Sequence, residues 1–245
     1  MKNRNSFIST HFTSRTDVFF FVCGILMLAS EAWKQFTLTF AIGHGIYNWW
    51  YFPFQLCSIP MYVLAAYPWL RGMRIRRAAL CFLMTYCPLG GIAVFADTTG
   101  LHYPLAALTV HSYVWHILLI LIGISSGAAF LRAAAGDEKR TLFARARTAL
   151  PLRPFLYGTV FYLICCLTAV LLNLTFDRYG AVNLFYINPD YRMQQVVFRD
   201  FVPLLGNTGT ILLYIGSTIL GAFLLFLFWT LLFRLFFTRR RSRRP

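Results

Sequence analysis

The chain has 245 residues, of which 58% are hydrophobic and only 13% charged, and its mean hydropathy is +0.61. A soluble domain carries roughly 25% charged residues, so this composition excludes an ordinary soluble protein and predicts a polytopic membrane protein with no separate soluble domain. The formal net charge of +15 would suggest a nucleic-acid partner in a soluble protein. Here the basic residues flank apolar segments, so we expect membrane orientation and no nucleic acid.

Six apolar segments are long enough to cross a bilayer, because a helix needs about 20 residues to span a hydrocarbon core of about 30 Å. We predict an all-α, six-helix transmembrane bundle over residues 17–237, with a cytoplasmic segment 1–16 before it and a basic cytoplasmic tail 238–245 after it. We expect the first span to be retained, since it lacks a convincing signal-peptide cleavage site. The predicted spans are approximately 17–35, 49–70, 78–96, 105–131, 154–176 and 208–237.

The basic residues indicate how this bundle is oriented. With a cytoplasmic N-terminus, all but four of the 23 Lys and Arg residues fall on the cytoplasmic side. Loops on that side of a membrane carry such an excess, so both termini are predicted to be cytoplasmic. The four exceptions are Lys34, Arg178, Arg192 and Arg199.

Residues 52–60 contain the most informative polar cluster of the chain. They place Gln55, Cys57 and Ser58 between two prolines inside the second predicted span. A bilayer core offers no water to unsatisfied polar groups, so such a cluster is a candidate functional site.

The fourth predicted span carries two histidines, His111 and His116. It runs in the same direction as the second span, and Cys57 and His116 each lie roughly 3–5 Å outward of their midpoints at 1.5 Å per residue. A thiol beside an imidazole is the pair that nucleophilic catalysis needs, and His111, more than a turn further out, is the second candidate. The alternative is that an intramembrane histidine only joins helices by hydrogen bonds.

Further polar residues gather toward the predicted outer face. Glu31 and Asp97 are candidates to orient a histidine, and Gln55 and Ser58 could donate to an oxyanion. The loop 177–207 is rich in aromatic residues and is expected to fold over the mouth of the bundle, as long ordered loops often do. It contains Asn183, Tyr186 and Gln195.

All six cysteines fall inside predicted spans, which argues against a disulfide framework. No Cys-x-x-Cys or His-plus-Cys spacing is present, so we expect no metal site and no cofactor.

Three stretches resemble the YwaF-like bacterial integral membrane family: Glu31-Ala-Trp-Lys-Gln, Phe52-Pro-Phe-Gln-Leu-Cys-Ser-Ile-Pro-Met-Tyr, and His111-Ser-Tyr-Val-Trp-His. The loop sequence Asn183-Leu-Phe-Tyr-Ile-Asn-Pro, followed by Gln195, is similar too. This family is related to a eukaryotic transmembrane acyltransferase that remodels phospholipids with a membrane cysteine. The resemblance implies a bacterial plasma-membrane protein in which Cys57 accepts the acyl group, His116 is its general base, and His111 or Gln55 assists.

Two functions remain open at this point. The first is a lipid acyltransferase or hydrolase that forms a thioester on Cys57, with membrane lipids as partners and an acyl chain as substrate. The second is a non-enzymatic transporter or small-ligand-binding component, since interrupted helices, here around Pro53, Pro60 and Pro88, occur in transporters as well. The absence of a detectable repeat and the scarcity of charges in the spans favour the enzyme. The sequence indicates no oligomeric state.

Overall fold

The computed structural model describes residues 14–140 and 150–241, and every regular element in these ranges is a helix. Most of the predicted segment 1–16 and the end of the tail 238–245 therefore lie outside the described residues. Five helical stretches are long and apolar enough to cross a membrane, which makes the chain a multi-pass membrane protein. They are Arg15–Ile42, Met73–Ala96, Ala106–Ala135, Leu152–Tyr179 and Phe198–Leu235.

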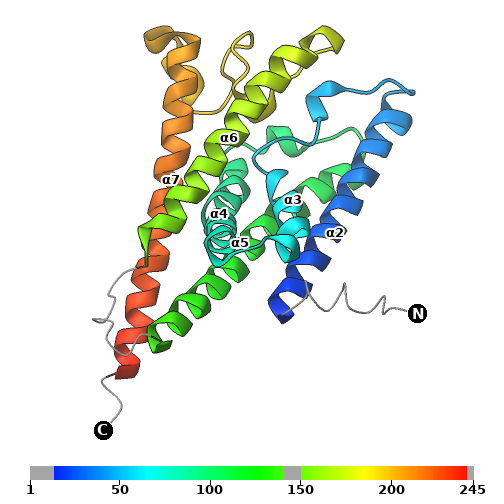
Figure 1. Ribbon diagram of the computed structural model, residues 1–245. Coiled ribbons are helices and arrows are strands. Elements are labelled where there is room, and N and C mark those ends of the chain that lie inside the picture. The colour runs from blue at the N-terminus through cyan, green and yellow to red at the C-terminus, as the bar shows by residue number, and fades with distance from the viewer. Residues whose placement is uncertain (1–13, 141–149, 242–245) are drawn as a thin grey trace, which may run out of the picture.

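The long helices agree with five of the six predicted spans (Figure 1). α7 breaks at Gly206, where φ is 67°, so its regular part begins close to the predicted residue 208. α2 continues into a π-helical turn, Thr37–Ile42. The helices are α2 (Arg15–Phe36), α4 (Met73–Ala93), α5 (Ala106–Arg140), α6 (Leu152–Phe176) and α7 (Val202–Arg241).

The prediction of a continuous helix over 49–70 is wrong. This segment consists of a 3-10 turn (Trp49–Tyr51), an irregular stretch, the short helix α3 (Ile59–Ala66) and a second 3-10 turn (Tyr67–Trp69). α3 has eight residues and is about 12 Å long, too short to span a bilayer alone. Pro60 lies in its first turn, where a missing N–H is tolerated, whereas Pro53 lies in the irregular half.

The broken segment nevertheless returns the chain to the end of the bundle from which it started. Asp17 in the first turn of α2 pairs with Arg76 in the first turn of α4, so both helices begin at the same end. α3 packs against α2 at Gly24, where an added Cβ would overlap the backbone of Ala65. In Figure 1, α2, α4 and α6 run in one direction and α5 and α7 in the other, and α2 begins on the side where α7 ends.

α4 is the central helix of the bundle (Figure 1). Every residue from 80 to 88 is buried, and the helix contacts α5, α6 and α7. A helix that is buried all around belongs in a protein core. Two α5 glycines allow close approach: an added Cβ on Gly123 would lie 2.6 Å from Pro88 of α4, and one on Gly127 would overlap the ring of Trp229 of α7. This small-xxx-small pair therefore serves helix packing.

Candidate functional site

Cys57 lies at the end of the irregular half of the second segment, directly before α3. The indole N–H of Trp115, on α5, donates to the carbonyl oxygen of Cys57 at 3.1 Å. Gly90, near the end of α4, faces this segment, since an added Cβ would stand 3.9 Å from the Cys57 nitrogen, at ordinary contact distance. Cys57 is half-buried, and the next residue, Ser58, is buried at the N-cap of α3. α4 and α5 thus fix the position of the irregular segment that contains Cys57.

His116 is buried on α5, and its backbone carbonyl faces Gly91, where an added Cβ would stand only 2.7 Å away. Its Nδ1 lies 2.7 Å from the carbonyl oxygen of Ser112. A carbonyl only accepts hydrogen bonds, so Nδ1 carries the proton and Nε2 is the basic nitrogen of the neutral ring. Cys57 and His116 thus lie against consecutive glycines of α4, at the same level of the bundle.

Among the described residues, no hydrogen bond joins the Cys57 thiol to either imidazole. The pairing of Cys57 with His116 therefore stays a prediction. The orienting partner of His116 is the Ser112 carbonyl of its own helix, and among the described side chains neither Glu31 nor Asp97 bonds to it.

His111 faces α2 instead. Its Nε2 lies 2.8 Å from the hydroxyl oxygen of Ser30, and its ring packs against those of Trp33 and Trp115, each with a centroid separation of 5.6 Å. Trp115 therefore contacts Cys57 through its N–H and His111 through its ring. Its role was not predicted, because an indole in a span is ordinarily a packing residue.

A buried charged cluster closes the end of α2. The Glu31 carboxylate, 3% exposed, forms an ion pair with Lys34 Nζ at 2.8 Å and accepts a hydrogen bond from Gln35 Nε2 at 2.6 Å. Gln35 Nε2 also donates to the Tyr51 carbonyl at 2.7 Å, which ties the second segment to α2. Glu31 is therefore one half of an ion pair and not an isolated carboxylate.

Asp97 belongs to a separate, exposed turn after α4. The hydroxyl and the backbone N–H of Thr99 donate to its carboxylate at 2.7 and 3.0 Å, and these bonds hold the pKa of Asp97 below its usual range. Its carboxylate is therefore engaged within its own turn.

The loop after α6 packs into the bundle and is held by side-chain amides. Gln55 donates from Nε2 to the Asn183 carbonyl at 3.1 Å and accepts from the Phe185 N–H at 2.6 Å. Asn173 of α6 bonds in the same two-way manner to the N–H and the carbonyl of Leu184, at 2.7 and 3.1 Å. Asn183 itself is buried, and its Oδ1 accepts from the backbone of Asn188.

Tyr186 lies in this loop with φ at 57°, and the side chain of Gln195 is close to its hydroxyl. Burial raises the pKa of Tyr186, so the phenol is neutral near pH 7. Left-handed backbone is uncommon for residues other than glycine and persists where surrounding contacts enforce it. Phe185 and Val197 share the left-handed conformation, with φ at 57° and 73°.

The structure thus assigns the predicted residues to two connected groups. Cys57 and His111 both contact Trp115, whereas His116 bonds to its own helix and the side chains of Gln55 and Asn183 bond to the backbone of the loop. Glu31 lies with Lys34 and Gln35. Asn173 was missed, although an asparagine within an apolar span is itself a signal.

Within residues 14–140 and 150–241, no group of three or more His, Cys, Asp or Glu side chains is placed to hold a metal ion. No protein-family model, no curated protein sequence and no solved structure matches the chain.

Proposed function

We propose that the chain is a bacterial plasma-membrane protein, with both termini in the cytoplasm, that transfers or hydrolyses acyl groups of membrane lipids through a thioester on Cys57. His116 is the general base. The resemblance of residues 52–62 and 111–116 to the YwaF-like family supports this proposal, as does the location of the cluster within an apolar bundle open to lipid.

The observation that carries the proposal is the hydrogen bond from His116 Nδ1 to the Ser112 carbonyl, at 2.7 Å. It leaves Nε2 as the basic nitrogen of the neutral ring, and this nitrogen can accept the thiol proton. His111 has its Nε2 engaged with the Ser30 hydroxyl, so His116 is the better base of the two. The adjacent contacts of Cys57 with Gly90 and of His116 with Gly91 favour the same pair.

The Cys57 thiol and the His116 imidazole together account for every proton transfer of the proposed reaction. The Cys57 thiol gives its proton to His116 Nε2 while its sulfur attacks the carbonyl carbon of an ester. The new C–S bond forms as the C–O bond breaks, and the imidazolium returns the proton to the departing alcohol. A second alcohol, or water, then attacks the thioester, releases the acyl group and restores the thiol.

The oxyanion of the tetrahedral intermediate needs a donor close to Cys57. Ser58 is buried beside it and carries a hydroxyl. Gln55 uses both ends of its amide on the loop backbone, so its role is to anchor the loop. Ser58 is therefore the proposed donor.

Labelling with an activated fatty-acid ester that carries a terminal alkyne tests the proposal. We expect a hydroxylamine-sensitive acyl label on Cys57 of the purified protein, located by peptide mass spectrometry. Cys57→Ala abolishes it, and His116→Ala slows its formation by roughly 10²–10⁴-fold, the usual contribution of a general base. Cys23→Ala is the matched control, because Cys23 is another half-buried free thiol, and it leaves labelling unchanged.

Label on Cys57→Ala at the wild-type level would overturn the assignment of the nucleophile. Equal slowing by His111→Ala and His116→Ala would remove the distinction between the two histidines.

The second candidate function is binding or transport of a small ligand. It is favoured by the buried Glu31–Lys34–Gln35 cluster, in which the Oε1 atom of Gln35 has no hydrogen-bond partner among the described residues. If the wild-type protein forms no thioester in the labelling experiment, binding or transport is favoured over acyl transfer.

A further inference from the structure

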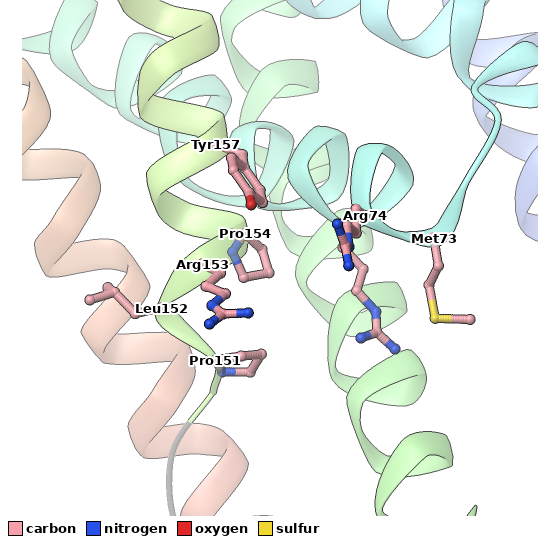
Figure 2. Close-up of a pocket in the computed structure, with 8 residues that line it drawn as sticks. Met73, Arg74, Pro151, Leu152, Arg153, Pro154 and Tyr157 are labelled. Carbon is pink, nitrogen blue, oxygen red and sulfur yellow. The ribbon is translucent and has the colours of Figure 1, made fainter.

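An open cavity of about 820 Å³ lies between the first turns of α4 and α6 (Figure 2). It is separate from the Cys57 region: Arg77 and Gly90 are both on α4, and 13 residues of helix span roughly 20 Å. In the predicted orientation the cavity opens at the cytoplasmic surface of the membrane. The residues that line it are Met73, Arg74, Arg77, Pro151, Leu152, Arg153, Pro154 and Tyr157; we call it the arginine cavity.

The arginine cavity is strongly cationic. Arg74 and Arg77 come from α4 and Arg153 from α6, and no acidic side chain is among the described residues that line it. Figure 2 shows Arg74 and Arg153 extending from the two helices into the same opening. Guanidinium groups bind phosphate oxygens through paired, charge-assisted hydrogen bonds. Arg74 and Arg153, from the two helices that border one cavity, therefore favour a phosphate-bearing ligand.

Two helix N-termini add to this preference. Met73 and Arg74 open α4, and Leu152 and Arg153 open α6, so backbone N–H groups without an intrahelical acceptor lie at the cavity wall. Among the described residues, no side chain caps either terminus. Each terminus also carries about half a positive charge from the helix dipole.

The remaining walls are apolar, and they point to a lipid rather than to a soluble anion. Met73, Leu152 and Tyr157 expose large apolar surfaces at the rim of the cavity. From there α6 continues with a row of exposed aliphatic side chains at helical spacing, on which an acyl chain can lie. This row consists of Leu156, Val160, Ile164, Leu167 and Leu171.

We propose that the arginine cavity binds the phosphate of an anionic phospholipid, with the acyl chains along the exposed face of α6. The double variant Arg74→Gln/Arg153→Gln removes two of its three charges. The matched control is Arg71→Gln/Arg132→Gln, because both of these arginines are exposed at the same end of the bundle and neither lines the cavity. The two variants lose the same net charge.

Native mass spectrometry of the full chain in an uncharged detergent, titrated with phosphatidylglycerol or phosphatidylcholine, is the test. We expect phosphatidylglycerol to bind the wild type more tightly than phosphatidylcholine does. The cavity variant lowers this affinity by about tenfold or more, as expected for the loss of charge-assisted bonds, and the control changes it by less than about twofold. Arg74→Lys/Arg153→Lys keeps the charge and retains most of the affinity, which separates binding from folding.

Equal loss of phosphatidylglycerol in the two Gln variants would overturn the site, since it indicates a diffuse attraction to all basic residues at this end. Equal binding of the two lipids to the wild type would overturn the preference for an anionic lipid. Displacement of phosphatidylglycerol by an equal concentration of inorganic phosphate would identify a free phosphate, and not a lipid, as the ligand.

Discussion

Trp115 of α5 holds Cys57 in place by donating its indole N–H to the Cys57 carbonyl oxygen, 3.1 Å away. The bond matters because the backbone around Cys57 is irregular and satisfies only some of its own polar groups, whereas a helix satisfies nearly all of them. In an apolar environment such groups need partners from elsewhere in the protein. One side chain on a long helix supplies a partner here and at the same time packs against His111.

We predict that Trp115→Phe keeps the aromatic packing but leaves the Cys57 carbonyl unpaired, which lowers the free energy of unfolding by about 1–3 kcal/mol. Thermal unfolding in detergent measures this loss. Maleimide labelling of Cys57 should become faster as well, because the segment loosens. Trp50→Phe serves as the control, since the Trp50 indole makes no hydrogen bond within the described ranges. Equal effects of the two substitutions would contradict the prediction.

Gly127→Ala should destabilise the packing of α5 on α7. The new methyl group would overlap the Trp229 ring, whose N–H is itself bonded to the Met84 carbonyl, so the ring is not free to move. Overpacking of this kind costs about 1–3 kcal/mol. Gly216→Ala is the matched change on α7, where an added Cβ meets nothing within 4 Å, and it should be neutral or stabilising. The two melting temperatures decide the prediction, which fails if Gly127→Ala is as stable as Gly216→Ala.

Asn173→Leu should release the loop after α6. It removes two hydrogen bonds and leaves the buried N–H of Leu184 without a partner, whereas the Leu184 carbonyl keeps the N–H of Ile187, so the expected cost is about 1–3 kcal/mol. Limited proteolysis should then cut within residues 180–197 faster than in the wild type. Thr175→Val on the same helix removes only a bond to its own helix, at an exposed position, and should leave the cleavage rate unchanged. Similar rates in both variants would show that the amide is dispensable.

The ion pair between Asp17 and Arg76 should couple the starts of α2 and α4. A double-mutant cycle with Asp17→Asn and Arg76→Gln is expected to give a coupling energy of about 1–3 kcal/mol, since Asp17 is fully buried. Asn keeps an acceptor for the backbone N–H of Ser14, so the cap of α2 is retained. Additive effects of the two substitutions on chemical unfolding would refute this coupling.

Hydropathy and length were sufficient to predict the long helices. α6 was expected over 154–176 and forms Leu152–Phe176, because its hydrogen bonds are internal and its apolar length alone decides its span. The second segment is equally apolar, so hydropathy and length could not show that its helix is broken. Pro53 and Pro60 marked where it could break, but two carbonyls of its irregular half, those of Tyr51 and Cys57, depend on Gln35 of α2 and Trp115 of α5.

The pairing of Cys57 with His116 was argued from positions along two parallel spans, and it stays a prediction. In the structure, backbone atoms of the two residues lie against the consecutive residues Gly90 and Gly91. The tautomer of His116 and the engagement of Gln55 with the loop depend on side-chain directions that spacing does not determine. The left-handed backbone at Tyr186 is likewise imposed by tertiary contacts and has no local sequence signal.

The anchoring of Gln55 has a consequence for biosynthesis. Its loop partner Asn183 lies 128 residues further along the chain, and the ribosome adds roughly 5–20 residues per second. Gln55, in the irregular half of the second segment, therefore waits at least several seconds for the loop backbone to which its side-chain amide bonds. Insertion of the first third of this protein is completed only when its last third arrives.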